Sequence, residues 1–236
     1  MNYAIKILRK ARSKLPLPNP EYDQYFCSKK TVFDRVQLFS DLIKDKSSRF
    51  LFIGDDDFTS LMVAALLCPD EITVLDIDLG ILNIISETAS RHNLNISVCH
   101  YDVRNPLPED LFGRFDIVFT DPPYTSQSIK VFLTRARLSI ASGNSVCAFC
   151  YSDLDMNQES ITALPGLLES LSFRITKEYP RFCHYEPSLH ILPAEYNLNC
   201  PNTEPWFYSH LVTLSPLSPC KPTNINYCNI PLYDYK

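Results

Sequence analysis

The sequence predicts an α/β fold built on a mainly parallel sheet with helices on both faces. Between residues 49 and 179, short apolar runs alternate with longer stretches of helical character. This alternation is typical of βαβ units, in which the strands run parallel and the helices cover the sheet. With 45% hydrophobic and 21% charged residues among 236, the chain can bury a full core, so a wholly disordered chain is excluded.

The elements follow one another without long gaps. The first strand is a compact apolar run that ends at Gly54. The strands are expected as short apolar runs at residues 49–53, 71–75, 95–99, 115–120, 145–151, 173–179 and 206–213. The helices are expected between them at residues 59–67, 79–91, 126–140 and 159–171. Ligands of such sheets bind beyond the carboxyl ends of the strands, so the loops there are the places to search for function.

Both flanks differ in composition from this region, and we predict three parts. Residues 1–45 are predicted to form a basic, helical N-terminal extension, interrupted by three prolines. Residues 46–215 are predicted to form the α/β domain. Residues 216–236 are predicted to be an irregular tail that contains proline and cysteine.

Charge and hydropathy exclude several classes of protein. The formal charge of −5 argues against a non-specific nucleic-acid binder. No apolar run approaches the length of a membrane span, so we expect no membrane protein. The basic N-terminus lacks the continuous apolar segment of a secretory signal, and we therefore expect a cytoplasmic protein.

Nine cysteines are scattered along the chain, and we expect free thiols in a reducing compartment. Cys147 and Cys150 have C-x-x-C spacing but lie in an apolar run. We interpret them as small hydrophobic side chains of a buried strand, because a zinc or redox site needs turn residues or a second pair. We predict no metal site.

Glycine is scarce, with 5 residues against 18 prolines. Neither G-x-G-x-x-G nor the P-loop motif occurs, so the usual glycine-rich dinucleotide and phosphate sites are excluded. Gly54 nevertheless stands directly after the first strand, where a tight turn beside a ligand needs a glycine.

Acidic residues follow four successive strands. They are Asp55, Asp56 and Asp57, then Asp76 and Asp78, then Asp102, and finally Asp121. In a parallel sheet these four places converge on one crevice. Any one of them taken alone is explained as the cap of the next helix, but four in register favour a binding site.

Two of these places indicate a nucleoside ligand. Asp76 follows Gly54 by about 20 residues, the spacing at which an acid at a strand end hydrogen-bonds ribose hydroxyls. Asp78 stands beside it. Asp102 is expected to accept a hydrogen bond from the adenine amino group.

The segment Asp121-Pro-Pro-Tyr124 is informative by itself. Two prolines fix the backbone, the aspartate accepts hydrogen bonds from an amine, and the tyrosine ring offers a face for stacking or for a cation. The segment resembles the [DNS]-P-P-[YFW] signature of class I S-adenosylmethionine-dependent methyltransferases that modify amino groups. This resemblance implies a Rossmann-like class I methyltransferase fold with a seven-stranded sheet. A turn without function is the alternative explanation of a D-P-P segment.

The loop after the first strand favours a cation. Three carboxylates beside the carboxylate of S-adenosylmethionine would repel it, whereas a donor without its carboxylate, or a polyamine, suits the loop. Clustered and partly desolvated aspartates are also expected to include one with a raised pKa that can take a proton from an amine.

Six segments within residues 17–180 resemble the branched-chain polyamine synthases. They are residues 21–24, 54–60, 74–78 and 102–108, together with the closely spaced pieces 115–116 and 120–123. Those enzymes transfer aminopropyl groups from decarboxylated S-adenosylmethionine to a secondary amine of spermidine. The resemblance implies a Rossmann-like transferase in which the acidic loop and the D-P-P segment flank the reacting nitrogen. Residues 1–48 are too few for the N-terminal winged-helix-like domain of that family.

On this hypothesis each candidate residue has a role. Asp56 or Asp57 deprotonates the acceptor amine, and Asp121 and Tyr124 orient it. The expected donor contacts are Asp55 with the terminal ammonium, Asp76 and Asp78 with the ribose, Asp102 with the adenine, Gly54 at the turn and Gln24 closing over the donor. The expected partner is a small amine or polyamine, and monomer and homodimer both stay open.

Two alternatives remain. One is a methyltransferase, or an aminocarboxypropyl transferase, that uses S-adenosylmethionine itself and acts on an amino group. The other is a non-catalytic nucleoside-binding module that kept the fold, against which the intact Asp121-Pro-Pro-Tyr124 segment argues.

Overall fold

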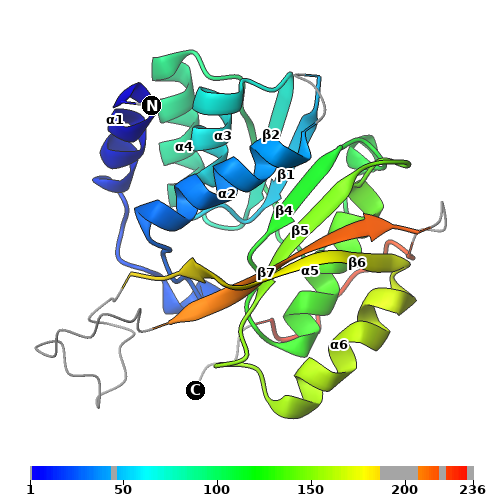
Figure 1. Ribbon diagram of the computed structural model, residues 1–236. Coiled ribbons are helices and arrows are strands. Elements are labelled where there is room, and N and C mark those ends of the chain that lie inside the picture. Colours follow the sequence, from blue (N-terminus) through cyan, green and yellow to red (C-terminus); the bar gives the residue numbers. More distant parts are fainter. Residues whose placement is uncertain (1, 44–46, 187–206, 218–221, 233–236) are drawn as a thin grey trace, which may run out of the picture.

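One mixed sheet organises the chain, of which the computed structural model describes residues 2–43, 47–186, 207–217 and 222–232 (Figure 1). The strand order is β3-β2-β1-β4-β5-β7-β6. The strands are β1 (Arg49–Ile53), β2 (Glu71–Asp76), β3 (Ser97–His100), β4 (Ile117–Thr120), β5 (Val146–Tyr151), β6 (Phe173–His184) and β7 (Tyr208–Pro216). Strands β1 to β5 pair in parallel, and β7 runs antiparallel between β5 and β6. The predicted seven-stranded, mainly parallel sheet is confirmed, with one antiparallel strand.

Helices cover both faces of the sheet, as predicted. Helices α1 to α4 lie on one side, and α5 and α6 lie on the other (Figure 1). The helices are α1 (Asn2–Arg12), α2 (Lys29–Leu42), α3 (Thr59–Leu67), α4 (Leu79–His92), α5 (Ser126–Ser139) and α6 (Gln158–Ser170), with two 3₁₀ turns, η1 (Pro20–Tyr22) and η2 (Glu109–Leu111). None of the helices in these described ranges is long and apolar enough to cross a bilayer.

Polar side chains fix where the helices begin. The side chains of Ser28, Asp78, Thr125 and Asn157 each accept a hydrogen bond from a backbone N–H in the first turn of α2, α4, α5 and α6. Such caps satisfy donors that have no partner inside the helix. Helix α4 ends at His92, and the capping residue Asn93 takes the left-handed conformation that asparagine tolerates.

Several strand boundaries differ from the predicted ones. Strands β3 and β4 each begin two residues later, at Ser97 and Ile117. Strand β6 continues beyond Tyr179, the last residue of the predicted strand, and passes through Pro180, which lacks an N–H. A register shift between Tyr179 and Cys183 accommodates the proline. Trp206, the expected start of the last strand, lies outside the described residues.

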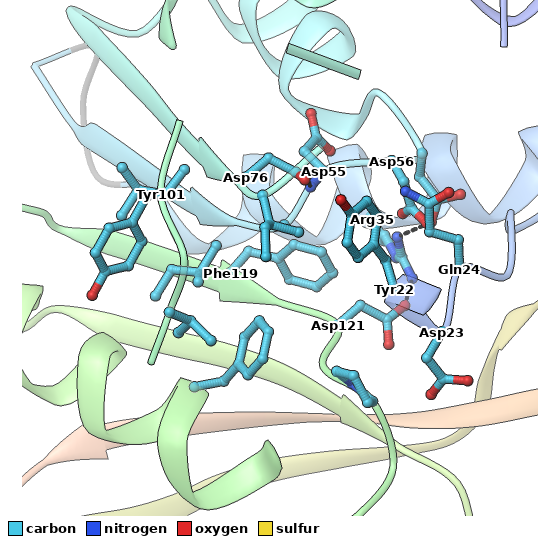
Figure 2. Close-up of a pocket in the computed structure, with 18 residues that line it drawn as sticks. Tyr22, Asp23, Gln24, Arg35, Asp55, Asp56, Asp76, Tyr101, Phe119 and Asp121 are labelled. Atoms are coloured by element: carbon cyan, nitrogen blue, oxygen red, sulfur yellow. Dashed lines mark hydrogen bonds and ion pairs between the residues drawn. The ribbon is translucent and has the colours of Figure 1, made fainter. Parts of the chain in front are cut away.

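The carboxyl ends of β1, β2 and β4 face one pocket (Figure 2). Ile53, Leu75 and Phe119 from these strands form its apolar floor. The loop that follows each strand therefore starts at the pocket, as expected for a parallel sheet.

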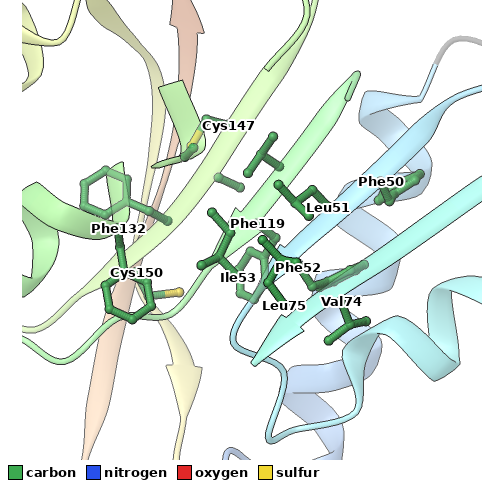
Figure 3. Close-up of a cluster of buried hydrophobic side chains, with 14 of the residues drawn as sticks. Phe50, Leu51, Phe52, Ile53, Val74, Leu75, Phe119, Phe132, Cys147 and Cys150 are labelled. Atoms are coloured by element: carbon green, nitrogen blue, oxygen red, sulfur yellow. The ribbon is translucent and has the colours of Figure 1, made fainter. Parts of the chain in front are cut away.

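Phenylalanines fill the centre of the core, where Phe50, Phe52 and Phe119 lie on adjacent strands (Figure 3). Phe39 of α2 meets all three rings edge to face, at centroid distances of 5.5 to 6.2 Å. Edge-to-face pairs of this kind add to the stability that burial provides. Helix α2 is thereby fixed against the strands that carry the pocket.

The cysteines of the C-x-x-C segment lie in the core. Cys147 and Cys150 of β5 are fully buried, which confirms their interpretation as small hydrophobic side chains. The Sγ atoms of Cys150 and Cys183 are 3.6 Å apart, and both thiols are free.

The described part of the C-terminal tail has no helix or strand, yet it is packed. Leu232 is buried, and the Asn224 amide both accepts from the Leu107 N–H and donates to the Leu107 carbonyl. This contact joins the tail to the loop after β3. The predicted division at residues 45/46 and 215/216 stays a prediction.

Candidate active site

The pocket at the strand ends is strongly acidic. Seven of the ten predicted site residues line it: Gln24, Gly54, Asp55, Asp56, Asp57, Asp76 and Asp121. Asp23 also lines the pocket, and the one cationic side chain among its lining residues in the described ranges is Arg35 (Figure 2). Asp78, Asp102 and Tyr124 do not line the pocket.

Gly54 turns the chain into the acidic loop. Its φ of +78° lies in the left-handed region that favours glycine. The Gly54 N–H donates to the Leu75 carbonyl at 2.7 Å, which keeps the turn beside the end of β2.

Asp55 caps helix α3 from inside the loop. Its Oδ1 accepts from the Thr59 N–H at 2.8 Å, and its Oδ2 accepts from the Ser60 N–H at 3.0 Å. Burial raises the pKa of Asp55 to about 8, although the hydrogen bonds from Ser60 and Thr59 lower it in part. We expected Asp55 to contact the terminal ammonium of the donor; in the structure its carboxylate caps α3.

Asp57 and Asp121 share one guanidinium. Arg35 Nη1 lies 2.8 Å from Asp57 Oδ2, and Arg35 Nη2 lies 2.6 Å from Asp121 Oδ2. Asp57 Oδ1 accepts from the Cys27 N–H at 2.6 Å and lies 3.5 Å from Arg12 Nη2. The Asp57 carboxylate is thus committed to protein partners.

Asp56 is different from its two neighbours. Within the described part of the chain, no hydrogen bond or ion pair involves its carboxylate, which lines the pocket. Burial raises its pKa well above the ordinary value, and the negative charges of Asp57, Asp76 and Asp121 raise it further. A raised pKa makes a carboxylate a stronger base, which suits it to take a proton from an amine.

Asp76 connects the loops after β1 and β2. Its Oδ2 accepts from the Asp55 N–H at 2.9 Å, and its Oδ1 accepts from the Asp78 N–H at 2.8 Å. Burial raises the pKa of Asp76 to about 6, and the two backbone hydrogen bonds lower it in part. Asp76, which we expected to contact the ribose, lines the pocket.

Asp78 caps α4 and holds the side chain of Gln24. Its Oδ1 caps α4 through the Gly80 N–H at 2.7 Å, and its Oδ2 accepts from Gln24 Nε2 at 3.0 Å. Gln24 Oε1 in turn accepts from the Asn19 N–H at 2.9 Å. Gln24 therefore lines the pocket, and Asp78 holds its side chain in place.

Asp102 faces Arg104. The Arg104 guanidinium donates to both Asp102 oxygens, with Nη2 to Oδ2 at 2.6 Å and Nε to Oδ1 at 2.9 Å. Burial would raise the pKa of Asp102, but the hydrogen bonds from Arg104 prevail and lower it. Its neighbours Tyr101 and Val103 line the pocket instead.

Tyr124 is buried and contacts the carboxylate of Asp121. Its hydroxyl donates to Asp121 Oδ1 at 2.7 Å, and burial raises its pKa, which keeps it a donor. The Tyr185 hydroxyl donates to Asp121 Oδ2 at 2.7 Å and lies 2.5 Å from the Tyr124 hydroxyl. Together with Arg35, the two tyrosines fix the Asp121 carboxylate.

Sequence reasoning missed Arg35 and Tyr185. Arg35 has a signal, because it lies three residues after Val32 and four before Phe39, on the apolar face of its helix. A charged residue on a buried face requires a partner. Tyr185 has no such signal, since it follows β6 and meets Asp121 only through the fold. The described residues contain no cluster that could hold a metal ion.

Comparison with known sequences places these features in a family context. The chain matches the model of the branched-chain polyamine synthase A C-terminal domain over residues 4–206. It is 34% identical over 185 residues to an uncharacterized protein of Methanocaldococcus jannaschii, covering 77% of this chain and 46% of that protein. It is 38% identical over 121 residues to an N(4)-bis(aminopropyl)spermidine synthase of the same organism, covering 51% of this chain and 35% of that enzyme. The chain spans less than half the length of these relatives.

Solved structures show the fold. A branched-chain polyamine synthase of Thermus thermophilus, in complex with N4-aminopropylspermidine and 5′-methylthioadenosine, matches with a TM-score of 0.87 and 23% identity, over 98% of this chain and 68% of that chain. A putative RNA methyltransferase of Pyrococcus horikoshii matches with a TM-score of 0.60 and 15% identity, over 92% of this chain and 100% of that chain. The predicted Rossmann-like class I methyltransferase fold is confirmed.

Proposed function

This chain belongs to the family of branched-chain polyamine synthase C-terminal domains, and from that premise we propose that it transfers an aminopropyl group from decarboxylated S-adenosylmethionine to an amine of a polyamine. The relatives named N(4)-bis(aminopropyl)spermidine synthase support this activity, since the matched region of one is 38% identical. In this proposal the acceptor is a small polyamine, and decarboxylated S-adenosylmethionine is a second substrate that is consumed in the reaction.

The charge of the pocket carries the proposal. Six aspartates and a single arginine line it. Away from bulk water, that balance attracts an ammonium or sulfonium ion and repels a carboxylate. The decarboxylated donor and a polyamine are both cations, whereas S-adenosylmethionine would bring a carboxylate beside Asp55 and Asp56. The pocket therefore favours the decarboxylated donor.

Asp56 is our candidate for the general base. Its pKa is raised and its carboxylate has no partner among the described residues, whereas Asp57 is held by Arg35 and Cys27. In the proposed step, an acceptor ammonium first gives its proton to Asp56. The nitrogen lone pair then forms a bond to the propyl carbon next to sulfur, and the electrons of the broken C–S bond stay on sulfur. The products are the extended polyamine and neutral methylthioadenosine.

The other lining residues would bind and orient. We assign the ribose hydroxyls to Asp76 and the adenine side to the wall of Tyr101 and Val103, which line the pocket at the end of β3. Asp121, held by the tyrosine hydroxyls and Arg35, would accept a hydrogen bond from the acceptor nitrogen. Because Asp55 caps α3, we give the donor's terminal ammonium to the negative field of the loop as a whole. Most of the rate would come from alignment and preset charge.

A methyltransferase is the second candidate. The Asp121-Pro-Pro-Tyr124 segment favours it, because this segment resembles the signature of enzymes that methylate amino groups. That candidate, and the related aminocarboxypropyl transferase, both require the pocket to accept the donor's carboxylate.

Calorimetric titration tests the proposal. Decarboxylated S-adenosylmethionine should bind more tightly than S-adenosylmethionine, and incubation with spermidine should give a product whose mass is larger by one aminopropyl unit. Tighter binding of the carboxylated donor would reject the proposal in favour of a methyltransferase or aminocarboxypropyl transferase. If neither donor nor methylthioadenosine binds, the chain is a non-catalytic module.

A further inference from the structure

We propose that Arg35 is a positioning residue of this site. Its two terminal guanidinium nitrogens hold the carboxylates of Asp57 and Asp121, one each, and the carboxylate of Asp56 stays free for the substrate amine. This inference rests on the proposed function, because it names the residue that prepares the reacting groups. Arg35 comes from α2, outside the strand-end loops.

The geometry is that of a bridge. Arg35 is 1% exposed, and its Nη1 and Nη2 atoms each contact one carboxylate, at 2.8 and 2.6 Å. Its guanidinium carbon lies 4.8 Å from the centre of the Phe119 ring, so the fork rests on a strand of the pocket floor. The bridge thereby ties the loop after β1 to the loop after β4.

Each bridged carboxylate has further partners that complete its orientation. Asp57 accepts from the Cys27 N–H and lies near Arg12, and Asp121 accepts from the hydroxyls of Tyr124 and Tyr185. Both carboxylates are therefore held by several groups from distant parts of the chain. Arg35 is the group that the two have in common.

The charge of Arg35 also acts on Asp56. The charged groups that line the pocket around Asp56 are Asp23, Asp55, Asp57, Asp76, Asp121 and Arg35. Neutralising Arg35 removes the cation that Asp57 and Asp121 share and makes the surroundings of Asp56 more negative. A more negative environment raises the pKa of a carboxyl group. Asp56 would then become a carboxylate only at higher pH.

A guanidinium suits this task better than an ammonium. Its planar fork presents separate N–H groups to two acceptors, whereas the ammonium of lysine is a single point on a flexible stem. Arg35→Lys therefore keeps the charge but cannot hold both carboxylates at these distances. The lysine variant separates the effect of geometry from the effect of charge.

The experiment compares Arg35→Lys and Arg35→Met with the wild type and with Arg49→Met. Arg49 is a matched control, because it pairs with Asp116 at 3.1 Å at the opposite end of β1 and does not line the pocket. Melting temperature, methylthioadenosine affinity and the pH dependence of kcat and KM for aminopropyl transfer are measured for each. We expect kcat to fall about 100-fold in Arg35→Met, the effect of misplacing a reacting group by about 1 Å.

The pH profile distinguishes positioning from mere stability. We expect the acidic limb of kcat to move to higher pH in Arg35→Met but to stay in place in Arg35→Lys, whose kcat still falls. Methylthioadenosine affinity should stay within about twofold, because Arg35 contacts neither Asp76 nor Tyr101. An unchanged kcat in both variants, or a loss that follows the melting temperature with an unchanged pH profile, would overturn the proposal.

The failure of the two proposals can be separated. If the wild type transfers no aminopropyl group, the proposed function fails. The ionisation of Asp56 is then followed directly by carbon NMR of its carboxyl, assigned with Asp56→Asn. A titration that is the same in wild type and Arg35→Met would overturn the role of Arg35 independently of activity, including in a variant that melts at a lower temperature but remains folded during the measurement.

Discussion

The Oδ2 atom of Asp76 accepts a hydrogen bond from the backbone N–H of Asp55 at 2.9 Å. This contact attaches the start of the acidic loop after β1 to the end of β2. Asp55 then uses its own carboxylate to begin α3. The position of Asp56 is therefore determined by backbone groups on both sides of it rather than by its own side chain.

The turn at Gly54 is the first feature that can be tested. We expect Gly54→Ala to lower the free energy of unfolding by about 1–2 kcal/mol, because an alanine at φ +78° is strained. No neighbouring atom lies within 4 Å of the added Cβ, so crowding contributes nothing. Urea denaturation measures the change.

Gly166→Ala is the matched control for this substitution. Gly166 lies inside α6, and its added Cβ also meets nothing within 4 Å. Here alanine should stabilise the protein by about 0.5–1 kcal/mol, because a glycine within a helix is unfavourable. Equal effects of the two substitutions would contradict the role of the turn.

The carboxylate of Asp76, to which we assign the ribose hydroxyls, gives a second prediction. Asp76→Asn should weaken the binding of methylthioadenosine about 10- to 100-fold, the value of about 1.5–3 kcal/mol for a hydrogen bond to a charged group. Asp102→Asn should change it by less than about threefold, because the Asp102 carboxylate faces Arg104 and does not line the pocket. Calorimetry measures both affinities, and thermal melting checks that both variants fold. A larger effect at Asp102 would restore the adenine contact that the sequence suggested.

Local pattern explains why much of the fold was predictable. Apolar runs and their spacing located β1 and α3 within the chain, and the parallel sheet brought Asp55, Asp76 and Asp121 to one pocket as expected. Gly54 was noticeable because the whole sequence contains only 5 glycines.

Partners distant in sequence explain what was not predictable. The sequence left Asp56 and Asp57 equivalent, and Arg35 of α2 distinguishes them by pairing with one. Tyr185 directly follows the edge strand β6, and its hydroxyl meets Asp121, 64 residues earlier in the chain, only in the folded protein. The tail gave no periodic signal because its order comes from single contacts, such as that of Asn224 with a loop 117 residues away.

The general base gives a third prediction. Asp56→Asn should lower kcat for aminopropyl transfer about 10²- to 10⁴-fold, the usual contribution of a positioned base. Donor binding should persist, since no described residue depends on the Asp56 carboxylate for a hydrogen bond. Steady-state kinetics and calorimetry measure the two quantities.

Asp34→Asn provides the control for this variant. Asp34 lies on α2 next to Arg35, and its partner is the exposed Lys30. The same change of charge at this surface position should leave kcat unaltered. Full activity of Asp56→Asn would remove the residue from the mechanism.

Proton release on binding is the final prediction. Burial raises the pKa of Asp55 to about 8 and that of Asp76 to about 6, and it raises the pKa of Asp56 well above the ordinary value. At pH 7, Asp55 therefore keeps most of its proton and Asp76 a small fraction of its own, whereas ordinary aspartates have lost theirs. The raised pKa of Asp56 acts in the same direction. A bound cation stabilises the carboxylates and lowers their pKa values, so protons must leave.

Calorimetry in buffers of different ionisation enthalpy counts these protons. Near neutral pH, decarboxylated S-adenosylmethionine should release more protons than methylthioadenosine, because the latter is uncharged and does not oppose the negative field. The release should decrease once the pH rises above about 8, where Asp55 and Asp76 are already ionised in the free protein. In Asp56→Asn the release should be smaller, since one titrating group is gone. Proton uptake, or equal release with both ligands, would show that the acidic loop does not face the charged end of the donor.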